Sequence, residues 1–227
     1  MKILPFIFFL AVLNSSFCQA PKVYLLPGHG ADERVFTLLT LPHYDTKVLS
    51  YPDPYKEENF SSYAKRVAEQ IDTSEPFSLV GVSFGGMLSV EIAKHFPPER
   101  IVILSSAKCA QELPLTYRIF RNFPIHRIFS GQFFRWWGIR LQPLFEPISK
   151  EDRSFFRSML KAKRPTYMKR TINYILTWEE EQCDTEIIHV HGAKDRTIPY
   201  KNVSPTLTLP TAGHMMVYTH AKEVSQL

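Results

Sequence analysis

A glycine-serine-glycine pattern between two apolar segments constrains the fold of this chain more than any other feature. Gly81, Ser83 and Gly85 form a G-x-S-x-G motif directly after the apolar run Phe77–Val82 and directly before a helix-like segment at residues 85–96. This position indicates an abrupt turn from a strand into a helix, where the glycines leave room for the close approach of the two backbones. Such a turn exposes a hydroxyl at the edge of a sheet, so Ser83 is a candidate nucleophile.

Short apolar segments alternate with helix-like segments along most of the chain. Strands are predicted at residues 22–26, 46–50, 77–82, 100–106, 186–190 and 206–209. Residues 59–71 carry Tyr63, Val67 and Ile71 at helical spacing and are predicted to form an amphipathic helix. The strand at 100–106 has no polar alternation, as expected for a parallel strand covered on both faces. The sequence therefore predicts an α/β fold with a mainly parallel, doubly wound sheet, whose functional loops follow the carboxyl ends of the strands.

Two later segments complete a pattern that resembles the alpha/beta hydrolase family. Asp195 lies in an H-G-x-x-D-x-x-x-P segment that begins at His191, and His214 follows Gly213 near the C-terminus. The family's order along the chain is serine, acid, histidine. The resemblance runs from about residue 23 to the C-terminus and is weakest between residues 107 and 182. It implies that Ser83 attacks an acyl carbonyl, His214 carries the proton and Asp195 orients the imidazole.

The acid has a second candidate, because some family members carry it after the strand that precedes the helical cap. Glu112 occupies that place. Asp195 is favoured, since Gly192 and Pro199 shape a tight loop around it, whereas Glu112 lies in a segment without such signals. The remaining histidines are interpreted as surface or packing residues: His43, His95, His126, His189, His191 and His220.

The resemblance also implies two backbone N–H groups that bind an oxyanion. One belongs to Phe84, at the N-terminus of the helix that follows Ser83, where the helix dipole favours negative charge. The second lies in the loop after the first strand, which reads P-G-H-G at residues 27–30. The spacing from Gly28 to Phe36 favours the amide of His29; matching the family pattern one residue later would make Ala31 the donor instead.

Residues 107–182 interrupt the alternation of strands and helices with aromatic and basic, helix-like sequence. The resemblance implies a helical cap there, inserted into a hydrolase core formed by residues 21–106 and 183–227. The segment holds 14 Lys and Arg against 7 Asp and Glu, whereas the whole chain has a net charge of +5. We expect most of its aromatic side chains to form the core of the cap and most of its basic side chains to be a solvated face.

The N-terminus has the composition of a targeting segment. Residues 1–20 begin with one lysine, continue with an apolar run and are predicted to be a secretory signal peptide. The run is about half the roughly 20 residues that span a bilayer, so no stable membrane span is expected. The protein is thus expected to be exported, periplasmic or secreted, with a lipid anchor at Cys18 as the alternative. Cys109 and Cys183 are predicted to be unpaired, because they lie at opposite edges of the sheet.

The sequence contains none of the motifs typical of metal or nucleotide sites, and it has no internal repeat. No cofactor, structural metal or nucleic-acid partner is therefore expected. The function predicted is a serine hydrolase that cleaves a small or medium carboxylic ester, with a small-molecule acyl compound as substrate. The alternative is a non-hydrolytic relative, either a C–C lyase or a small-molecule binding protein, because this fold serves several chemistries. The sequence leaves the oligomeric state open.

Overall fold

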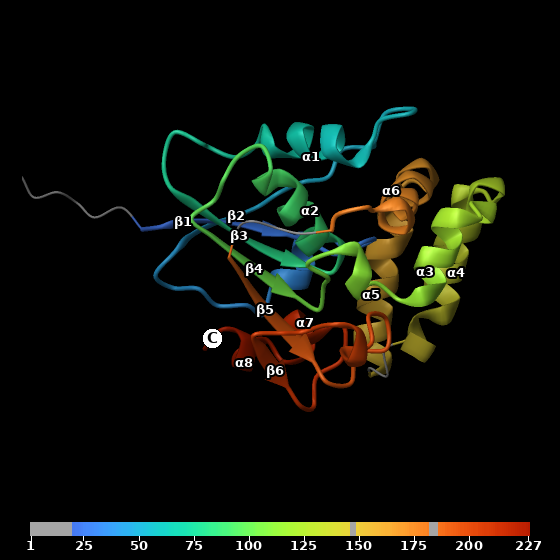
Figure 1. The fold of residues 1–227 in the computed structure, drawn as a ribbon. Helices are drawn as coiled ribbons and strands as arrows, with labels where there is room; N and C mark the ends of the chain where they lie inside the picture. The colour runs from blue at the N-terminus through green and yellow to red at the C-terminus, as the bar shows by residue number, and fades with distance from the viewer. Residues whose placement is uncertain (1–19, 146–148, 182–185) are drawn as a thin grey trace, which may run out of the picture.

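The computed structural model describes residues 20–145, 149–181 and 186–227 (Figure 1). The predicted leader, apart from Ala20, lies outside these residues, as does Cys183. Cys109 has a free thiol and is half-buried. No helix in the described part of the chain has the length and apolar character needed to cross a membrane.

Six parallel strands form one sheet in the order β2-β1-β3-β4-β5-β6. The strands are β1 (Lys22–Leu26), β2 (Asp45–Val48), β3 (Phe77–Val82), β4 (Arg100–Leu104), β5 (Ile187–Gly192) and β6 (Leu207–Leu209). The chain leaves β1 towards β2 and then crosses back to β3, so the strand order reverses between β1 and β3. Ligands of open parallel sheets bind at such a reversal, outside the carboxyl ends of the strands.

Helices cover both faces of the sheet, because alternate side chains of each strand point to opposite sides. On β1, Tyr24 and Leu26 pack under α1 (Phe60–Ala68) and α2 (Phe84–Ala93). Val23 and Leu25 pack on the other face, where η1 (Glu33–Phe36), α7 (Met216–Thr219) and α8 (Ala221–Val224) lie. Figure 1 shows these two layers on either side of the sheet. The doubly wound α/β architecture expected from the sequence is thereby confirmed.

Four helices lie between β4 and β5, beyond the carboxyl ends of the strands (Figure 1). They are α3 (Leu115–Asn122), α4 (Gly131–Phe145), α5 (Lys150–Ala162) and α6 (Pro165–Thr177), with short 3-10 turns η2 (Ala110–Glu112) and η3 (Ile125–Ile128). This helical insertion replaces the single crossover helix that a plain doubly wound sheet would have there.

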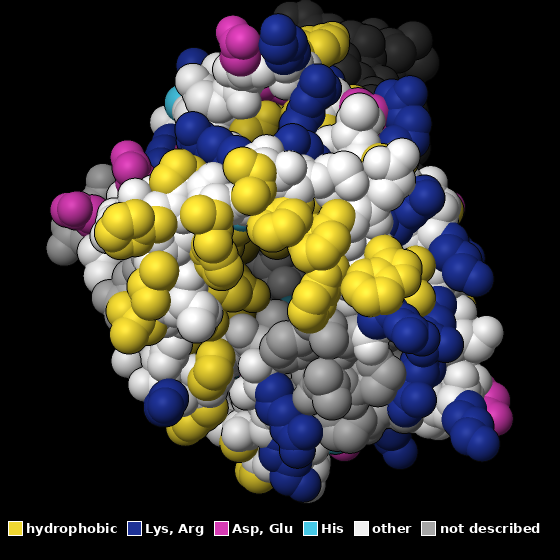
Figure 2. Space-filling model, turned by 90° about the vertical axis from the view of Figure 1, so that its right-hand side faces the viewer, with side chains coloured by type: hydrophobic (Ala, Val, Ile, Leu, Met, Phe, Trp, Pro, Cys, Tyr) yellow, Lys and Arg dark blue, Asp and Glu magenta, His cyan; other side chains and the backbone are white. Residues whose placement is uncertain are grey.

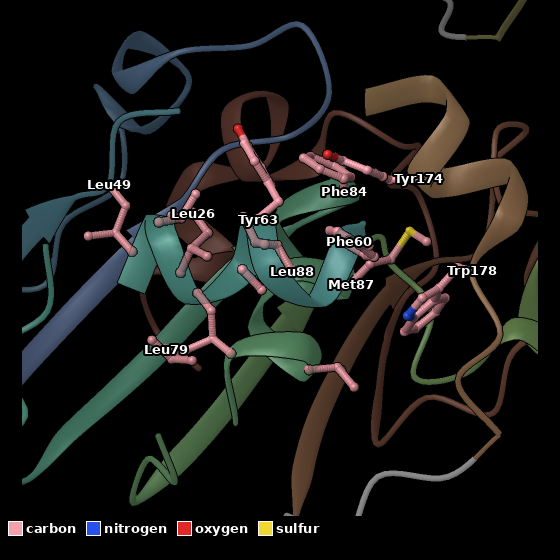
Figure 3. Packing of buried hydrophobic residues seen from close by; sticks show 14 of the residues in the cluster. Leu26, Leu49, Phe60, Tyr63, Leu79, Phe84, Met87, Leu88, Tyr174 and Trp178 are labelled. Carbon is pink, nitrogen blue, oxygen red and sulfur yellow. The ribbon is translucent and has the colours of Figure 1, made fainter. Parts of the chain in front are cut away.

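Helix α6 ties the insertion to the core. The ring of Tyr174 stacks on Phe60 of α1 at 5.2 Å between centroids, and its hydroxyl donates to the carbonyl of Glu58 at 2.9 Å. Figure 3 shows Phe60, Tyr174 and Phe84 in one buried cluster, although they come from three different helices. Helices α3 and α4 in turn pack on α6, so they form the outermost layer of the insertion.

Element boundaries differ from the sequence-based ones by a few residues. Helix α2 ends at Ala93, three residues before the predicted end, and β4 ends at Leu104 rather than at 106. The shorter β4 has a local cause, because Ser105 has a φ of 47°, which is incompatible with a continuing strand. Terminal turns of this kind depend on tertiary contacts and are poorly specified by local sequence.

Candidate active site

Ser83 sits in a strained turn between β3 and α2. Its φ of 52° and ψ of −119° lie outside the regions that L-residues ordinarily adopt. The glycines on either side make this turn possible: a Cβ on Gly81 would lie 2.4 Å from the carbonyl oxygen of Gly85, and one on Gly85 would lie 2.1 Å from that of Leu26. The G-x-S-x-G pattern thus reflects backbone contact on both sides of the serine.

Neighbouring strands hold the turn in place. The backbone N–H of Ser83 donates to the carbonyl of Leu104 at 2.9 Å, and its carbonyl accepts from the hydroxyl of Ser106 at 2.6 Å. Ser106 is fully buried. Ser106 was not predicted as a site residue, because its position at the end of an apolar strand gives no signal beyond that of an ordinary loop serine.

Ser83, His214 and Asp195 form a continuous hydrogen-bonded chain, although they are far apart in the sequence. The Oγ of Ser83 lies 2.9 Å from Nε2 of His214, and Nδ1 of His214 lies 2.8 Å from Oδ2 of Asp195. Because a carboxylate accepts, Nδ1 carries the proton and Nε2 is free to accept one from the serine. This arrangement can remove a proton from Ser83 as its oxygen attacks an electrophile.

The loop after β5 fixes the second oxygen of Asp195. Its Oδ1 accepts from the backbone N–H groups of Thr197 at 2.8 Å and Ile198 at 2.9 Å, and the side chain is inaccessible to solvent. Burial alone would raise the pKa of Asp195, but the electrostatic interaction with His214, the hydrogen bond from His214 and the Ile198 N–H outweigh that effect and lower the pKa. Asp195 is therefore ionised and oriented towards His214.

Two further histidines lie beneath this loop, on β5. Nε2 of His191 lies 2.9 Å from the carbonyl of Ile198 and 3.3 Å from Oδ2 of Asp195, and its Nδ1 lies 3.0 Å from Nε2 of His189. Both rings are fully buried. The expectation that they are packing residues is confirmed, and His191 in addition supports the carboxylate of Asp195. Burial lowers the pKa of His191, and burial together with His191 lowers that of His189 to about 3.

Glu112, the alternative acid, is engaged elsewhere. Its carboxylate accepts from the backbone N–H of Lys108 at 2.7 Å and from that of Ser204 at 3.4 Å. It thereby closes the turn at the start of the helical insertion, whereas the hydrogen-bond partner of Nδ1 of His214 is Asp195. The geometry favours Asp195 as the acid.

The candidate oxyanion donors lie on both sides of Ser83. Phe84 is the first residue of α2, where a backbone N–H has no acceptor within the helix. On the other side, a Cβ on Gly28 would be 3.4 Å from Cβ of Ser83, so the loop that carries His29 passes close to the serine. The N–H of Ala31 donates to the carbonyl of Gly28 at 3.0 Å and is thus already used in a turn. This bond favours His29 over Ala31 as the second donor.

The imidazole of His29 has a separate environment. It stacks on Tyr167 of α6 at 6.3 Å between centroids, and burial lowers its pKa to about 4, so it is neutral at pH 7. Its Nε2 is buried and has no hydrogen-bond partner among the described residues. The sequence predicted a role only for the backbone of His29, so this environment of the imidazole is a finding of the structure.

A cavity of about 350 Å³ opens in front of Ser83 and His214. All four helices of the insertion contribute to its wall, and most of the side chains that line it are apolar. The residues from the insertion are Leu113, Tyr117, Phe134, Trp137, Gly138, Phe156, Met159, Leu160, Met168, Ile172 and Ile175. Some of the aromatic side chains that were expected only to form the core of a cap therefore line the pocket instead.

Comparisons with known proteins agree with this architecture. The structure resembles a hydrolase from Oleispira antarctica (TM-score 0.70, 16% identity, 91% of this chain and 88% of the other). It also resembles a lipase-esterase related protein from Clostridium acetobutylicum (TM-score 0.66, 17% identity, 91% and 92%). A third similar structure is a thermophilic esterase from Thermogutta terrifontis with bound malate (TM-score 0.65, 14% identity, 91% and 87%). At these identities the likeness establishes the fold.

The sequence gives the family directly. No curated protein matches the chain in sequence. Residues 8–227, however, match the family model described as the Alpha/beta hydrolase family, which covers nearly the whole chain. Together with the parallel sheet and its serine turn, this match leads to one conclusion: the chain belongs to the alpha/beta hydrolase family.

Proposed function

We propose that this protein is a serine hydrolase that cleaves small or medium carboxylic esters through an acyl-enzyme. The observation that carries the proposal is the hydrogen-bonded chain from Ser83 through His214 to Asp195, at 2.9 and 2.8 Å. A serine activated in this way, at the wall of an apolar cavity, suits nucleophilic attack on an acyl carbon.

The proposed reaction has two halves. In the first, Oγ of Ser83 attacks the ester carbonyl while Nε2 of His214 takes its proton, and the imidazolium then protonates the departing alcohol. In the second, a water molecule gives its proton to His214 and attacks the acyl-enzyme, which releases the acid and restores Ser83. The amides of Phe84 and His29 bind the negative oxygen in both halves.

The cavity supports a small, uncharged substrate. Its volume of about 350 Å³ is at the lower end of the range for ligand sites. Among the described residues that line it there is no Lys, Arg, Asp or Glu. A charged acyl group would lose its hydration there without gaining an opposite charge. We therefore propose short aryl or alkyl esters, with the helical insertion acting as a cap over the pocket.

A fluorophosphonate probe tests the proposal, because it reacts with an activated serine whatever the natural substrate is. We expect labelling of the protein at Ser83, and no labelling of Ser83→Ala. The matched control is Ser89→Ala, which removes a buried hydroxyl that donates to the carbonyl of Gly85 within α2, away from the cavity. A folded protein that the probe leaves unlabelled would favour the non-hydrolytic alternative, a lyase or a binding protein.

A further inference from the structure

Exposed apolar side chains gather on one part of the surface. Every exposed Ile, Phe and Trp of the described residues lies between positions 119 and 137, with Ile128 at 79% and Phe123 at 67% exposure. We name this surface the apolar patch. Its members are Leu115, Ile119, Phe123, Ile125, Ile128, Trp136 and Trp137. Side chains of this kind are normally scattered singly over a surface, so such a cluster indicates an interaction site.

The patch borders the mouth of the cavity. Trp137 lines the cavity and is also exposed at the surface, so the wall of the cavity continues into the patch. Figure 2 shows the hydrophobic side chains around a hollow on this face of the molecule, with lysine and arginine side chains beside them. The patch lies on α3, η3 and α4, the outermost elements of the helical insertion.

The charges on the same elements have one sign. Residues 113–145 contain five arginines and neither Asp nor Glu. The side chains of Arg121, Arg127, Arg135 and Arg140 have no carboxylate of the described residues within salt-bridge distance. Arg140 instead lies over the ring of Trp136, 5.6 Å from its centroid. Arg127 donates to Oδ1 of Asn173 and Arg135 to the carbonyl of Lys163, each at 3.3 Å, but neither acceptor is charged. The positive charge of this surface is therefore not neutralised by these contacts and can attract an external anion.

A second copy of the chain is a poor occupant of this surface. In a symmetric dimer the same patch would face itself, so each set of unpaired arginines would meet an identical set. Like charges at that distance repel each other, and no acidic residue of the segment could offset them. The partner must therefore combine an apolar interior with a negatively charged surface.

We propose that the apolar patch docks on an anionic phospholipid bilayer. Tryptophan, isoleucine and phenylalanine side chains enter the boundary between headgroups and acyl chains, while the arginines bind the phosphate groups. In this orientation the mouth of the cavity faces the bilayer, so an apolar substrate can pass from the lipid to Ser83 without crossing water. The docking does not depend on the proposed hydrolase chemistry, because binding is measured without any substrate.

Tryptophan fluorescence can report this contact specifically. The chain has three tryptophans, of which Trp136 and Trp137 belong to the patch and Trp178 is buried at 3% exposure. Vesicles of phosphatidylcholine mixed equally with phosphatidylglycerol, with brominated acyl chains, quench only indole rings that reach the chains. We expect strong quenching by these vesicles and little by phosphatidylcholine alone. Absence of quenching by the anionic vesicles, with a folded protein, would overturn the proposal.

Two pairs of variants test the apolar and the charged parts separately. Phe123→Ala with Ile128→Ala should weaken binding to the anionic vesicles by about tenfold or more. The matched control, Leu38→Ala with Tyr44→Ala, removes exposed apolar groups outside the patch and should leave binding unchanged. An equal loss of vesicle binding in the patch variant and in its control would contradict a role for the patch.

For the charges, Arg127→Gln with Arg140→Gln should also weaken binding by at least about tenfold at low salt. The control, Lys56→Gln with Lys222→Gln, removes two exposed positive charges elsewhere and should have little effect. If the protein with Arg127→Gln and Arg140→Gln binds as tightly as the unsubstituted protein, the anionic headgroup is not what the surface recognises.

Hydrolysis of a water-soluble ester is the control for folding in all four double variants. Since none of the substituted residues lines the cavity, this hydrolysis should stay the same in each of them. A uniform loss of hydrolysis would show misfolding and would overturn the separation of the two surfaces.

Discussion

The imidazoles of His189 and His191 are hydrogen-bonded to each other inside the protein, with Nε2 of one 3.0 Å from Nδ1 of the other. Nε2 of His191 faces the carbonyl of Ile198, so it carries a proton, and its Nδ1 accepts from His189. Both rings are then neutral. A proton added to either would place a buried charge beside the Asp195 loop.

This pair predicts that the protein loses stability in mild acid. The pKa of His189 is lowered from 6.5 to about 3 in the folded protein, mainly by burial, and that of His29 to about 4. Between pH 6.5 and 3 the unfolded chain therefore binds more protons than the folded one, so the free energy of unfolding falls as the pH falls. Urea unfolding at a series of pH values measures this dependence.

His189→Gln should reduce the slope of unfolding free energy against pH in this window by up to about 1.4 kcal/mol per pH unit. The glutamine can still donate to His191 but does not titrate. His43→Gln is the control, because His43 is exposed. An unchanged slope for His189→Gln would mean that other groups dominate the acid response.

Substitutions in the hydrogen-bonded chain should separate the two candidate acids. Ser83→Ala should lower kcat on a p-nitrophenyl ester by about 10⁶ and His214→Ala by a similar factor, because the hydroxyl then stays protonated. Asp195→Asn should cost about 10⁴. Glu112→Gln should keep most of the activity, since Glu112 binds backbone N–H groups of Lys108 and Ser204 instead. The reverse pattern would move the acid to Glu112.

The second oxyanion donor can be tested at His29. His29→Pro removes the backbone N–H and should lower kcat by about 10²–10³. His29→Ala keeps that N–H and should retain much more activity, although it widens the cavity. Steady-state kinetics and circular dichroism on both variants give the comparison. If Ala31→Pro, and not His29→Pro, abolishes turnover in a folded protein, Ala31 is the donor.

The two glycines Gly85 and Gly138 should respond to alanine in opposite directions. A Cβ on Gly85 would lie 2.1 Å from the carbonyl oxygen of Leu26, so Gly85→Ala should destabilise the protein by about 3 kcal/mol or more. On Gly138, in α4, the Cβ would be 3.7 Å from Leu160, an ordinary contact, so alanine should stabilise the helix by up to about 1 kcal/mol. Denaturant unfolding of both variants checks the signs.

Substrate preference should follow the shape of the cavity. Across a p-nitrophenyl ester series we expect a maximum at short acyl chains, little hydrolysis of long triglycerides or peptides, and only a weak preference for a carboxylated ester. Measuring the series at low and high salt separates the effect of the cavity's shape on the rates from the effect of surface charge, because only the latter is screened by salt. A maximum at long chains, or a rate for the carboxylated ester that collapses in high salt, would show that the charge of the helical insertion selects the substrate.

Much of the fold follows from local sequence patterns. The apolar runs that become β1 and β3 are short and continuous, because a parallel strand is buried on both faces. The motif around Ser83 is equally visible in the sequence, although its two glycines are required by different contacts. Gly81 leaves room for the backbone of Gly85, four residues on, whereas Gly85 leaves room for the carbonyl of Leu26 on β1. The succession of strands and helices along the chain, the family and the serine turn could therefore be predicted from the residues alone.

What the sequence could not determine depends on residues that meet only in three dimensions. Ser106 supports the Ser83 turn through a hydrogen bond between the loops that follow β3 and β4. The contact between His191, near the end of β5, and Asp195, in the loop after β5, depends on how that loop folds back onto the strand. Ser106 has no distinctive neighbourhood in the chain, and the motif that contains His191 and Asp195 does not reveal that their side chains touch. The geometric preference for Asp195 over Glu112 likewise comes from which carboxylate the folded backbone places beside His214.

The helical insertion shows the same limit most clearly. Its aromatic and basic composition is evident in the sequence, but helical spacing does not reveal which face packs on α6, which lines the cavity and which stays in solvent. Phe156 is buried and Ile128 is exposed, although both are large and apolar. That division is set by the packing of helices against one another, because burial is a property of the assembled fold rather than of the residue.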